Sequence, residues 1–158
     1  MNADDPAVLS ILRQAMVARV ASLSRSGRPS ITSLYFVYGK GYLWLGTADW
    51  TLAAREVKAN PRVSVLFQIE KNPHDRGILR VTGSARVVTD PKTNRTNELR
   101  TAFKYILTPV GLAHYLAHLN LLQLNRRYHA QSAEKGHPCV LEVTPERFEL
   151  LHDEAARP

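Results

Sequence analysis

The chain has 158 residues, of which 44% are hydrophobic and 22% are charged, a balance typical of one globular domain and not of a disordered chain. The net charge of +7 suits an anionic ligand, but the basic residues are spread along the sequence without the run of like charges that marks a nucleic-acid-binding tail. The acidic start MNADDPAV does not resemble a signal peptide, and no uninterrupted apolar stretch reaches the roughly 18 residues of a membrane span. We therefore expect a cytoplasmic protein without membrane contact.

The first half of the chain is dominated by strand patterns. Asp5-Pro6 combines a helix-capping residue with a proline at the first helical position, and Asn60-Pro61 ends a second helix. Gly39-Lys40-Gly41 is a short glycine-containing hairpin loop. In chain order the pattern predicts a helix from Asp5-Pro6, strands over 17–24, 30–38 and 42–47, a helix over 50–59, and a strand over 62–69.

The second half adds more helix before the chain returns to strands. Asp90-Pro91 repeats the cap-and-proline signal, and Thr108-Pro109 opens a further amphipathic helix in the same manner. The predicted elements are a strand over 77–88, a helix from Asp90-Pro91 through Lys104 or Tyr105, a helix from Thr108-Pro109, and closing strands over 138–143 and 147–151 on either side of Thr144-Pro145.

Cys139 is the only cysteine, so the chain has no intrachain disulfide, which fits a reducing compartment. Its neighbours Pro138, Val140 and Leu141 indicate a strand. We therefore interpret Cys139 as a buried structural thiol rather than a nucleophile.

Most strands are expected in hairpins, and one short helix interrupts the first five of them. This order favours a mainly β protein with helices, built as an antiparallel sheet or barrel, over a doubly wound fold. We expect one domain, divided into an N-terminal helix (1–16), a barrel core (17–89), a helical insert (90–131) and closing strands (137–152).

Several short motifs occur in a characteristic order between Val17 and Val88. They are Ala18-Arg19-Val20-Ala21-Ser22-Leu23, Gly27-Arg28-Pro29, the strand Ile31 to Phe36, Leu45-Gly46-Thr47, Asn60-Pro61-Arg62-Val63-Ser64-Val65 and Arg80-Val81-Thr82-Gly83-Ser84-Ala85, with Val143-Thr144-Pro145-Glu146-Arg147 near the end. Over about half of the chain this series resembles the pyridoxamine 5'-phosphate oxidase-like split β-barrel flavoproteins. The helical stretch 93–131 lies outside the resemblance.

The resemblance implies a homodimer with a flavin, usually FMN, in the seam between the two chains. The strand 32–36 would then follow the isoalloxazine ring, Thr47 and Ala48 would lie near the ring and the ribityl chain, and the helix start at 50–53 would meet the phosphate. The implied cofactor-binding residues are Thr32, Ser33, Leu34, Tyr35, Thr47, Ala48, Trp50, Thr51, Arg55 and Arg80.

The sequence departs from this family at the helix start. Family members commonly carry a Ser-Arg-Lys type triplet there, and Thr51-Leu52-Ala53 takes its place, so the hydroxyl is kept and both cations are lost. Backbone N–H groups and the helix dipole still favour an anion, but charge-assisted hydrogen bonds are about twice as strong. We expect weaker phosphate binding, with Arg55, or else Arg19, Arg28 or Arg80, supplying the charge.

The leading functional hypothesis is a flavin-dependent oxidoreductase that binds FMN and acts on an unknown small molecule. The flavin carries the redox chemistry, so no catalytic side chain is assigned. One alternative is a reductase of the same fold that uses a deazaflavin coenzyme. Another is a non-catalytic module that binds a cofactor or haem or acts as a sensor. Nucleic-acid binding would rest on charge alone.

Two further expectations concern the second half of the chain. The insert 90–131 is expected to shape the substrate side of the pocket or to extend the dimer contact. His114 and His118 share a helix face at a spacing that suits a metal. However, Tyr115 stands where a metalloprotease HExxH motif would carry Glu, and no third ligand is suggested. We therefore interpret them as a polar stripe and assign no metal site.

Overall fold

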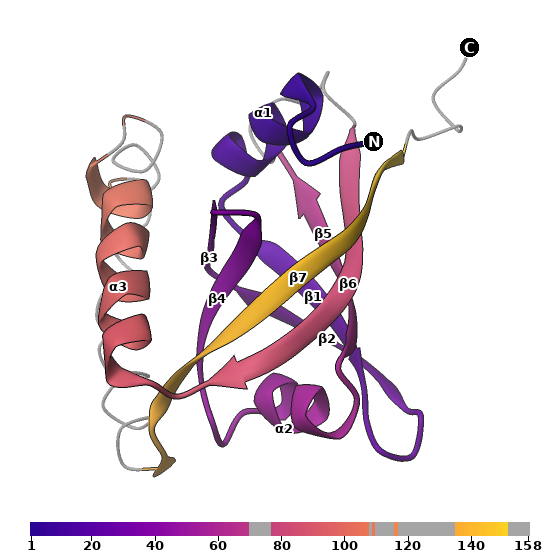
Figure 1. Cartoon of the computed structure of the whole chain (residues 1–158), viewed down its shortest axis with the longest axis vertical. Coiled ribbons are helices and arrows are strands. Elements are labelled where there is room, and N and C mark those ends of the chain that lie inside the picture. Colours follow the sequence, from indigo (N-terminus) through magenta and orange to yellow (C-terminus); the bar gives the residue numbers. More distant parts are fainter. Residues whose placement is uncertain (70–76, 108, 110–115, 117–134, 152–158) are drawn as a thin grey trace.

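The computed structural model describes residues 1–69, 77–107, 109, 116 and 135–151. Its seven described strands form one antiparallel sheet in the order β2-β1-β5-β6-β7-β4-β3 (Figure 1). The strands are β1 (Ala18–Leu23), β2 (Pro29–Leu34), β3 (Phe36–Gly39), β4 (Tyr42–Ala48), β5 (Arg62–Gln68), β6 (Ile78–Val88) and β7 (Pro138–Leu151). The helices are α1 (Pro6–Gln14), α2 (Leu52–Ala59), α3 (Pro91–Ala102) and the π-helical turn η1 (Phe103–Leu107). The expected mainly β, antiparallel split-barrel class is confirmed.

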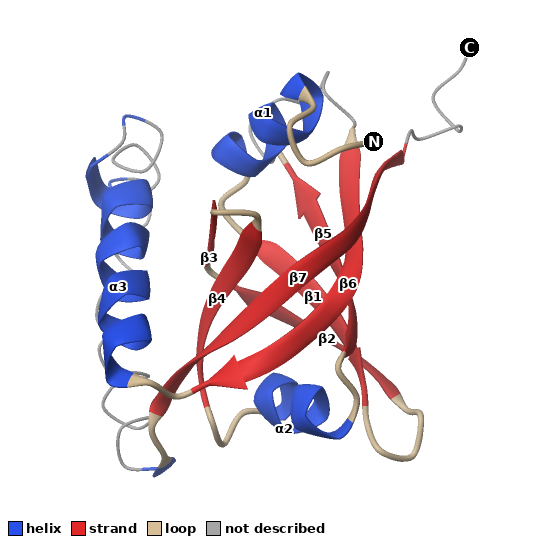
Figure 2. Cartoon of the chain, in the orientation of Figure 1, coloured by secondary structure: helices blue, strands red, loops and turns tan. Residues whose placement is uncertain are grey.

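The sheet curls into a barrel whose two ends are covered by α1 and α2, while α3 stands beside β3 and β4 (Figures 1 and 2). Alternate residues of the strands point inward and are fully buried, including Val20 of β1, Leu45 of β4 and Val65 of β5. Val8, Ile11 and Leu12 of α1 complete this core from one end, and Ala53, Ala54 and Val57 of α2 complete it from the other.

The structure corrects the predicted strand 30–38, which is two strands broken at Tyr35. β2 ends at Leu34 on one end of the sheet, and β3 begins at Phe36 on the opposite end. β2 also packs against β4, although no ladder joins these two strands. The break at Tyr35 therefore marks the split of the barrel, and β2 has a ladder partner on only one side.

The structure also corrects the two closing strands, because β7 runs continuously through Thr144-Pro145. The register with β6 shifts at this point: Thr82 pairs with Arg147 and Gly83 with Pro145, which leaves Glu146 as the extra residue of a bulge. A bulge tolerates proline because the missing N–H is not needed in the ladder. A Cβ atom on Gly83 would lie 2.1 Å from the Thr144 carbonyl oxygen, so this crossing requires glycine.

The predicted cap-and-proline helix starts at Asp5-Pro6 and Asp90-Pro91 are confirmed. The Asp5 carboxylate accepts from the Ala7 N–H at 2.9 Å, and the Asp90 carboxylate accepts from the Thr93 N–H at the same distance. α3 ends at Ala102 and η1 then covers Lys104 and Tyr105, so the helix predicted to run through these residues changes its hydrogen-bond pattern there. The helix expected from Thr108-Pro109 lies almost entirely outside the described residues, as do His114 and His118.

Cys139 confirms its prediction as a buried residue. It pairs with Thr47 in the β4–β7 ladder, and 2% of its surface is exposed. Burial raises the pKa of its thiol to about 11, so the sulfur stays protonated and non-nucleophilic near neutral pH. None of the described helices is both long enough and apolar enough to cross a membrane.

Candidate functional site at the barrel split

The centre of the candidate site is the short connection between the end of β4 and the start of α2. Thr51 is the N-cap of α2: its hydroxyl accepts from the Ala54 N–H and donates to the Ala48 carbonyl at 2.8 Å. The Thr47 hydroxyl lies 3.0 Å from the Thr51 hydroxyl. The first N–H groups of a helix have no intrahelical acceptor, so those of Leu52 and Ala53 are left for a ligand or water. The junction thus presents two adjacent hydroxyls and the positive end of a helix dipole.

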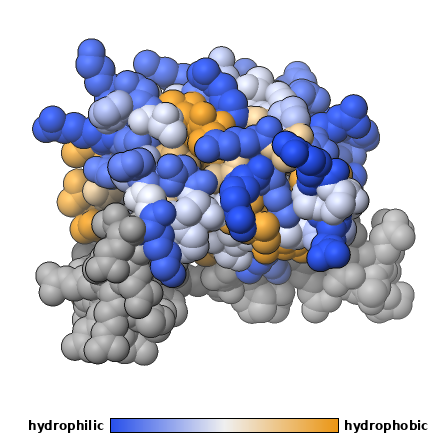
Figure 3. Space-filling view, turned by 90° about the horizontal axis from the view of Figure 1, so that it is seen from below, coloured by the Kyte–Doolittle hydropathy of each residue, from blue (hydrophilic) through white to orange (hydrophobic). Residues whose placement is uncertain are grey.

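The two positions that lack the family's cations, 52 and 53, lie in different environments. Leu52 is 48% exposed, whereas Ala53 is fully buried in the core. An arginine at position 52 would therefore reach solvent from the first turn of α2, but a lysine at position 53 would have to displace core side chains. Figure 3, seen from the α2 end, shows small hydrophobic areas between hydrophilic residues on this surface.

The loop before β7 closes over the same junction. The Asp49 N–H donates to the His137 carbonyl, and the His137 N–H donates to the Asp49 carboxylate, both at 3.0 Å. This clamp places the Lys135 ammonium 5.3 Å from the centre of the Trp50 ring. Trp50 Nε1 is a buried donor without a hydrogen-bond partner in the described structure. Sequence reasoning missed Lys135, because the contact joins residues 85 positions apart.

β2 supplies the second side of the site. Along β2, Thr32 and Leu34 are half-buried and Ser33 is exposed, and Tyr35, directly after the strand, is also exposed. The β3–β4 register pairs Phe36 with Leu45, which brings Tyr35 to the level of Gly46, one residue before Thr47. The structure thus brings the split, the end of β4 and the start of α2 into one region. Of these two aromatic neighbours, Phe36 is fully buried in the core, whereas Tyr35 is 49% exposed and faces outward.

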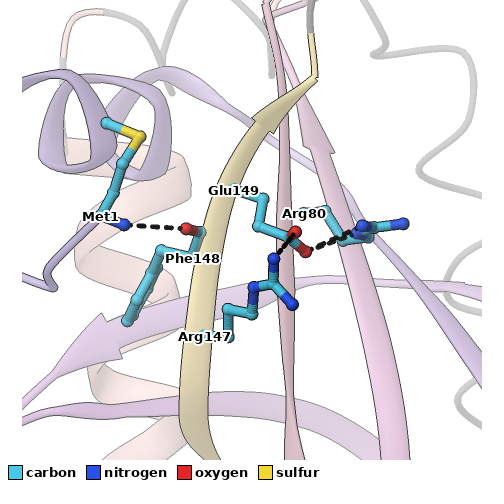
Figure 4. A network of polar contacts seen from close by, with 5 residues as sticks. All are labelled: Met1, Arg80, Arg147, Phe148 and Glu149. Atoms are coloured by element: carbon cyan, nitrogen blue, oxygen red, sulfur yellow. Dashed lines mark hydrogen bonds and ion pairs between the residues drawn. The ribbon is translucent and has the colours of Figure 1, made fainter.

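Two predicted residues lie away from this region or point outward. Arg55 is exposed on α2. Arg80 lies on β6, in the middle of the sheet, between the buried residues Leu79 and Val81, and so points outward. Its guanidinium pairs with the Glu149 carboxylate at 2.9 Å (Figure 4). Within one chain the structure does not bring Arg80 to the barrel split, so its predicted role would require a second copy.

η1 brings two residues to the other side of the Tyr35 break. The Tyr105 hydroxyl donates to the Met16 carbonyl at 2.8 Å and accepts from the Phe36 N–H at 3.1 Å. Its ring packs edge-on against the Tyr35 ring, with centroids 4.8 Å apart. Burial raises the pKa of Tyr105, so this hydroxyl keeps its proton over the physiological range. Tyr105 therefore fixes the backbone at the point where the barrel splits.

The fold and the order of motifs agree with what comparisons with known proteins found. A family model described as pyridoxamine 5'-phosphate oxidase matches residues 4–152, so the chain belongs to this family. A search of curated protein sequences gave no match.

Solved structures of this fold resemble the chain at low sequence identity. An F420 reductase is 21% identical over 89% of this chain and 94% of its own, with a TM-score of 0.62. The conserved hypothetical protein Rv2991 of Mycobacterium tuberculosis is 15% identical over 98% of this chain and 89% of its own, with a TM-score of 0.68. General stress protein 26 of Bacillus anthracis is 14% identical over 92% of this chain and 95% of its own, with a TM-score of 0.57. At these identities the likeness establishes the fold.

Proposed function

We propose that the protein is a flavin-dependent oxidoreductase that binds FMN at the barrel split, in a homodimer. The observation that carries this proposal is the junction of Thr47, Thr51 and the first turn of α2, at the position that the family uses for the cofactor phosphate. A bound flavin would supply hydride transfer at its ring, and the protein would supply binding and orientation. The substrate is a small molecule, and no acid or base is assigned.

The donors at the junction fit a phosphate in part. The Leu52 and Ala53 N–H groups, the helix dipole and the Thr47 hydroxyl favour an anion, while the Thr51 proton is already donated to the Ala48 carbonyl. The structure adds one cation to this set, Lys135, whose ammonium lies 5.3 Å from the centre of the Trp50 ring. We propose that Lys135 supplies part of the charge that the family obtains from its triplet, with Arg55 as the other source on α2 itself.

The second candidate is a deazaflavin coenzyme in place of FMN. This alternative rests on the fold shared with an F420 reductase and on the same junction. We expect either cofactor to place its phosphate at the start of α2. A non-catalytic binding or sensor module remains the alternative of a different class, and it would retain the fold without binding either cofactor.

Titration of the full-length protein with FMN and with the deazaflavin coenzyme, followed by flavin fluorescence, tests the proposal. A Leu52→Arg variant returns one cation to the exposed position of the first turn. If the phosphate binds there, this cation should tighten FMN binding about tenfold, the scale of one charge-assisted hydrogen bond. Leu99→Arg is the matched control, because Leu99 is 66% exposed on α3 and the charge change is the same.

Equal tightening in both variants would mean that net charge, not the α2 start, attracts FMN. Saturable binding of the deazaflavin coenzyme alone would select the second candidate. Absence of binding by both cofactors, in a protein that remains folded by circular dichroism, would overturn the oxidoreductase proposal.

A further inference from the structure

α2 carries a carboxylate in a place where its charge is costly. Glu56 is 5% exposed, and it lies in the C-terminal half of α2, toward the negative end of the helix dipole. None of the ion pairs among the described residues includes it. A buried carboxylate without a cation is expensive, and an apolar side chain of similar size would fill the site at less cost. We therefore expect Glu56 to have a role other than stabilising the fold.

The hydrogen bonds of Glu56 lead to the other side of the candidate site. Ser22 of β1 and Ser30 of β2 both donate to the same carboxylate oxygen, Oε2, the first at 2.6 Å. Ser22 is 2% exposed and Ser30 is half-buried, so both bonds are largely shielded from water. One oxygen atom thus joins α2 to two neighbouring strands. We call Glu56, Ser22 and Ser30 the serine–glutamate latch.

The latch connects the two parts of the proposed cofactor site. Glu56 lies on α2, whose first turn follows Thr51, and Ser30 lies on β2, two residues before Thr32. β2 is at the end of the sheet and has a ladder only with β1, whereas β1 is paired on both sides, with β2 and β5. The position of β2 relative to α2 therefore depends on the Ser30–Glu56 bond more than the position of β1 depends on Ser22.

We propose that Glu56 is a positioning residue, which holds the β2 strand at a fixed distance from the phosphate-binding start of α2 through Ser30. This inference rests on the proposed function, because it assigns the ring to β2 and the phosphate to α2. A cofactor that spans both elements gains affinity when they are held in place before it binds. In this proposal the latch does not bind the cofactor itself and acts by holding β2 against α2.

Ser30→Ala and Ser22→Ala separate this role from a purely structural one. Each variant removes one hydroxyl that donates to the same oxygen, so both should lower the melting temperature by similar amounts. Ser30→Ala should weaken FMN binding about tenfold, measured well below the melting temperature, while Ser22→Ala should change it less than about twofold. Glu56→Gln keeps an acceptor oxygen without the charge and should fall between Ser30→Ala and the unmodified protein.

Hydrogen exchange of the cofactor-free protein gives a readout that does not depend on FMN. Ser30→Ala should speed the exchange of the β2 amides relative to Ser22→Ala. Equal FMN affinity in the two serine variants, or equal exchange of β2, would overturn the positioning role while leaving the proposed function intact. If the unmodified protein binds no FMN, the proposed function fails, and the exchange data then decide separately whether the latch holds β2.

Discussion

Among the described residues, Lys104 has the pKa that burial shifts closest to physiological pH. Its ammonium donates to the Leu12 carbonyl at 3.1 Å and lies 3.4 Å from the centre of the Phe36 ring. Burial lowers the pKa of Lys104 to about 7. The aromatic ring favours the charged form and so opposes this shift in part. The side chain links η1 to the last turn of α1.

The lowered pKa of Lys104 predicts a pH-dependent stability. Between pH 7 and the ordinary lysine pKa of 10.5, the unfolded chain binds a proton that the folded chain lacks, so raising the pH favours folding. The free energy of unfolding should rise with pH across this window more steeply than in Lys104→Met, by at most about 1.4 kcal/mol per pH unit. Urea unfolding at pH 6, 7.5 and 9 measures the difference. A difference that stays constant with pH would contradict this account of Lys104.

Gly83 lies where the backbone leaves no room for a larger residue. The β-bulge at Thr144-Pro145 brings the Thr144 carbonyl oxygen to 2.1 Å from the position of a Cβ atom on Gly83. Gly83→Ala should therefore force a backbone shift and lower the free energy of unfolding by about 3 kcal/mol. Gly39→Ala is the control, since nothing lies within 4 Å of the added atom and the change should cost less than about 0.5 kcal/mol. Similar losses of unfolding free energy in the two variants would contradict the close approach of the Thr144 carbonyl to Gly83.

At the scale of elements, α3 and η1 attach to the barrel through a few long-range contacts. Tyr105 bridges Met16, at the entry to β1, and Phe36, at the start of β3. On the outer face of β4, the Arg100 guanidinium lies 5.7 Å from the centre of the Trp44 ring. The described part of the insert 90–131 thus packs against the barrel near its split, which is compatible with the expected role of the insert at the substrate side.

Tyr105→Phe tests this attachment. The change removes one hydroxyl and leaves the buried Phe36 N–H without its acceptor, which should lower the free energy of unfolding by about 1–3 kcal/mol. Tyr42→Phe is the matched control on a 37% exposed tyrosine and should change stability by less than about 0.5 kcal/mol. Urea unfolding followed by circular dichroism compares the two. An unchanged free energy in Tyr105→Phe would mean that this bridge does not hold the insert.

The sequence predicted most elements because their signals are local. Asp5-Pro6, Asp90-Pro91 and the glycine-containing hairpin loop fix their own backbone. The strand 30–38 was predicted as one because Ile31 to Val37 is uniformly β-forming; the break at Tyr35 is set by the opposite sheet edges that β2 and β3 join. β7 was predicted as two strands because proline normally ends a strand, and the tolerance of Pro145 depends on Gly83, 62 residues away.

The candidate site also has a part set by local sequence and a part set by contacts between distant segments. The junction from Thr47 to Thr51 is contiguous in sequence and was predicted together. Lys135, Tyr105 and the serine–glutamate latch depend on contacts between distant segments, and single residues of these types carry no pattern. In the sequence, Glu56 is an ordinary polar residue of an amphipathic helix; only the structure shows that it is buried and accepts from two serines.

At the scale of the whole molecule, one curled sheet brings its end strand β2 against β4 without joining these two strands in a ladder. The start of α2 lies beside this opening, and the basic net charge of +7 favours an anionic ligand in general. We propose that this opening holds a flavin between two copies of the chain. Two observations support this proposal: the chain belongs to the pyridoxamine 5'-phosphate oxidase family, and the Thr47 and Thr51 hydroxyls lie together at the start of α2.

The visible absorption spectrum of the freshly purified protein, with mass spectrometry of the compound released by heat, tests this claim most directly. We expect a two-banded flavin spectrum, release of FMN, and elution of the coloured protein as a dimer in size-exclusion chromatography with light scattering. A colourless, folded protein that takes up neither FMN nor the deazaflavin coenzyme on titration would contradict it and would leave a cofactor-free binding module as the better description.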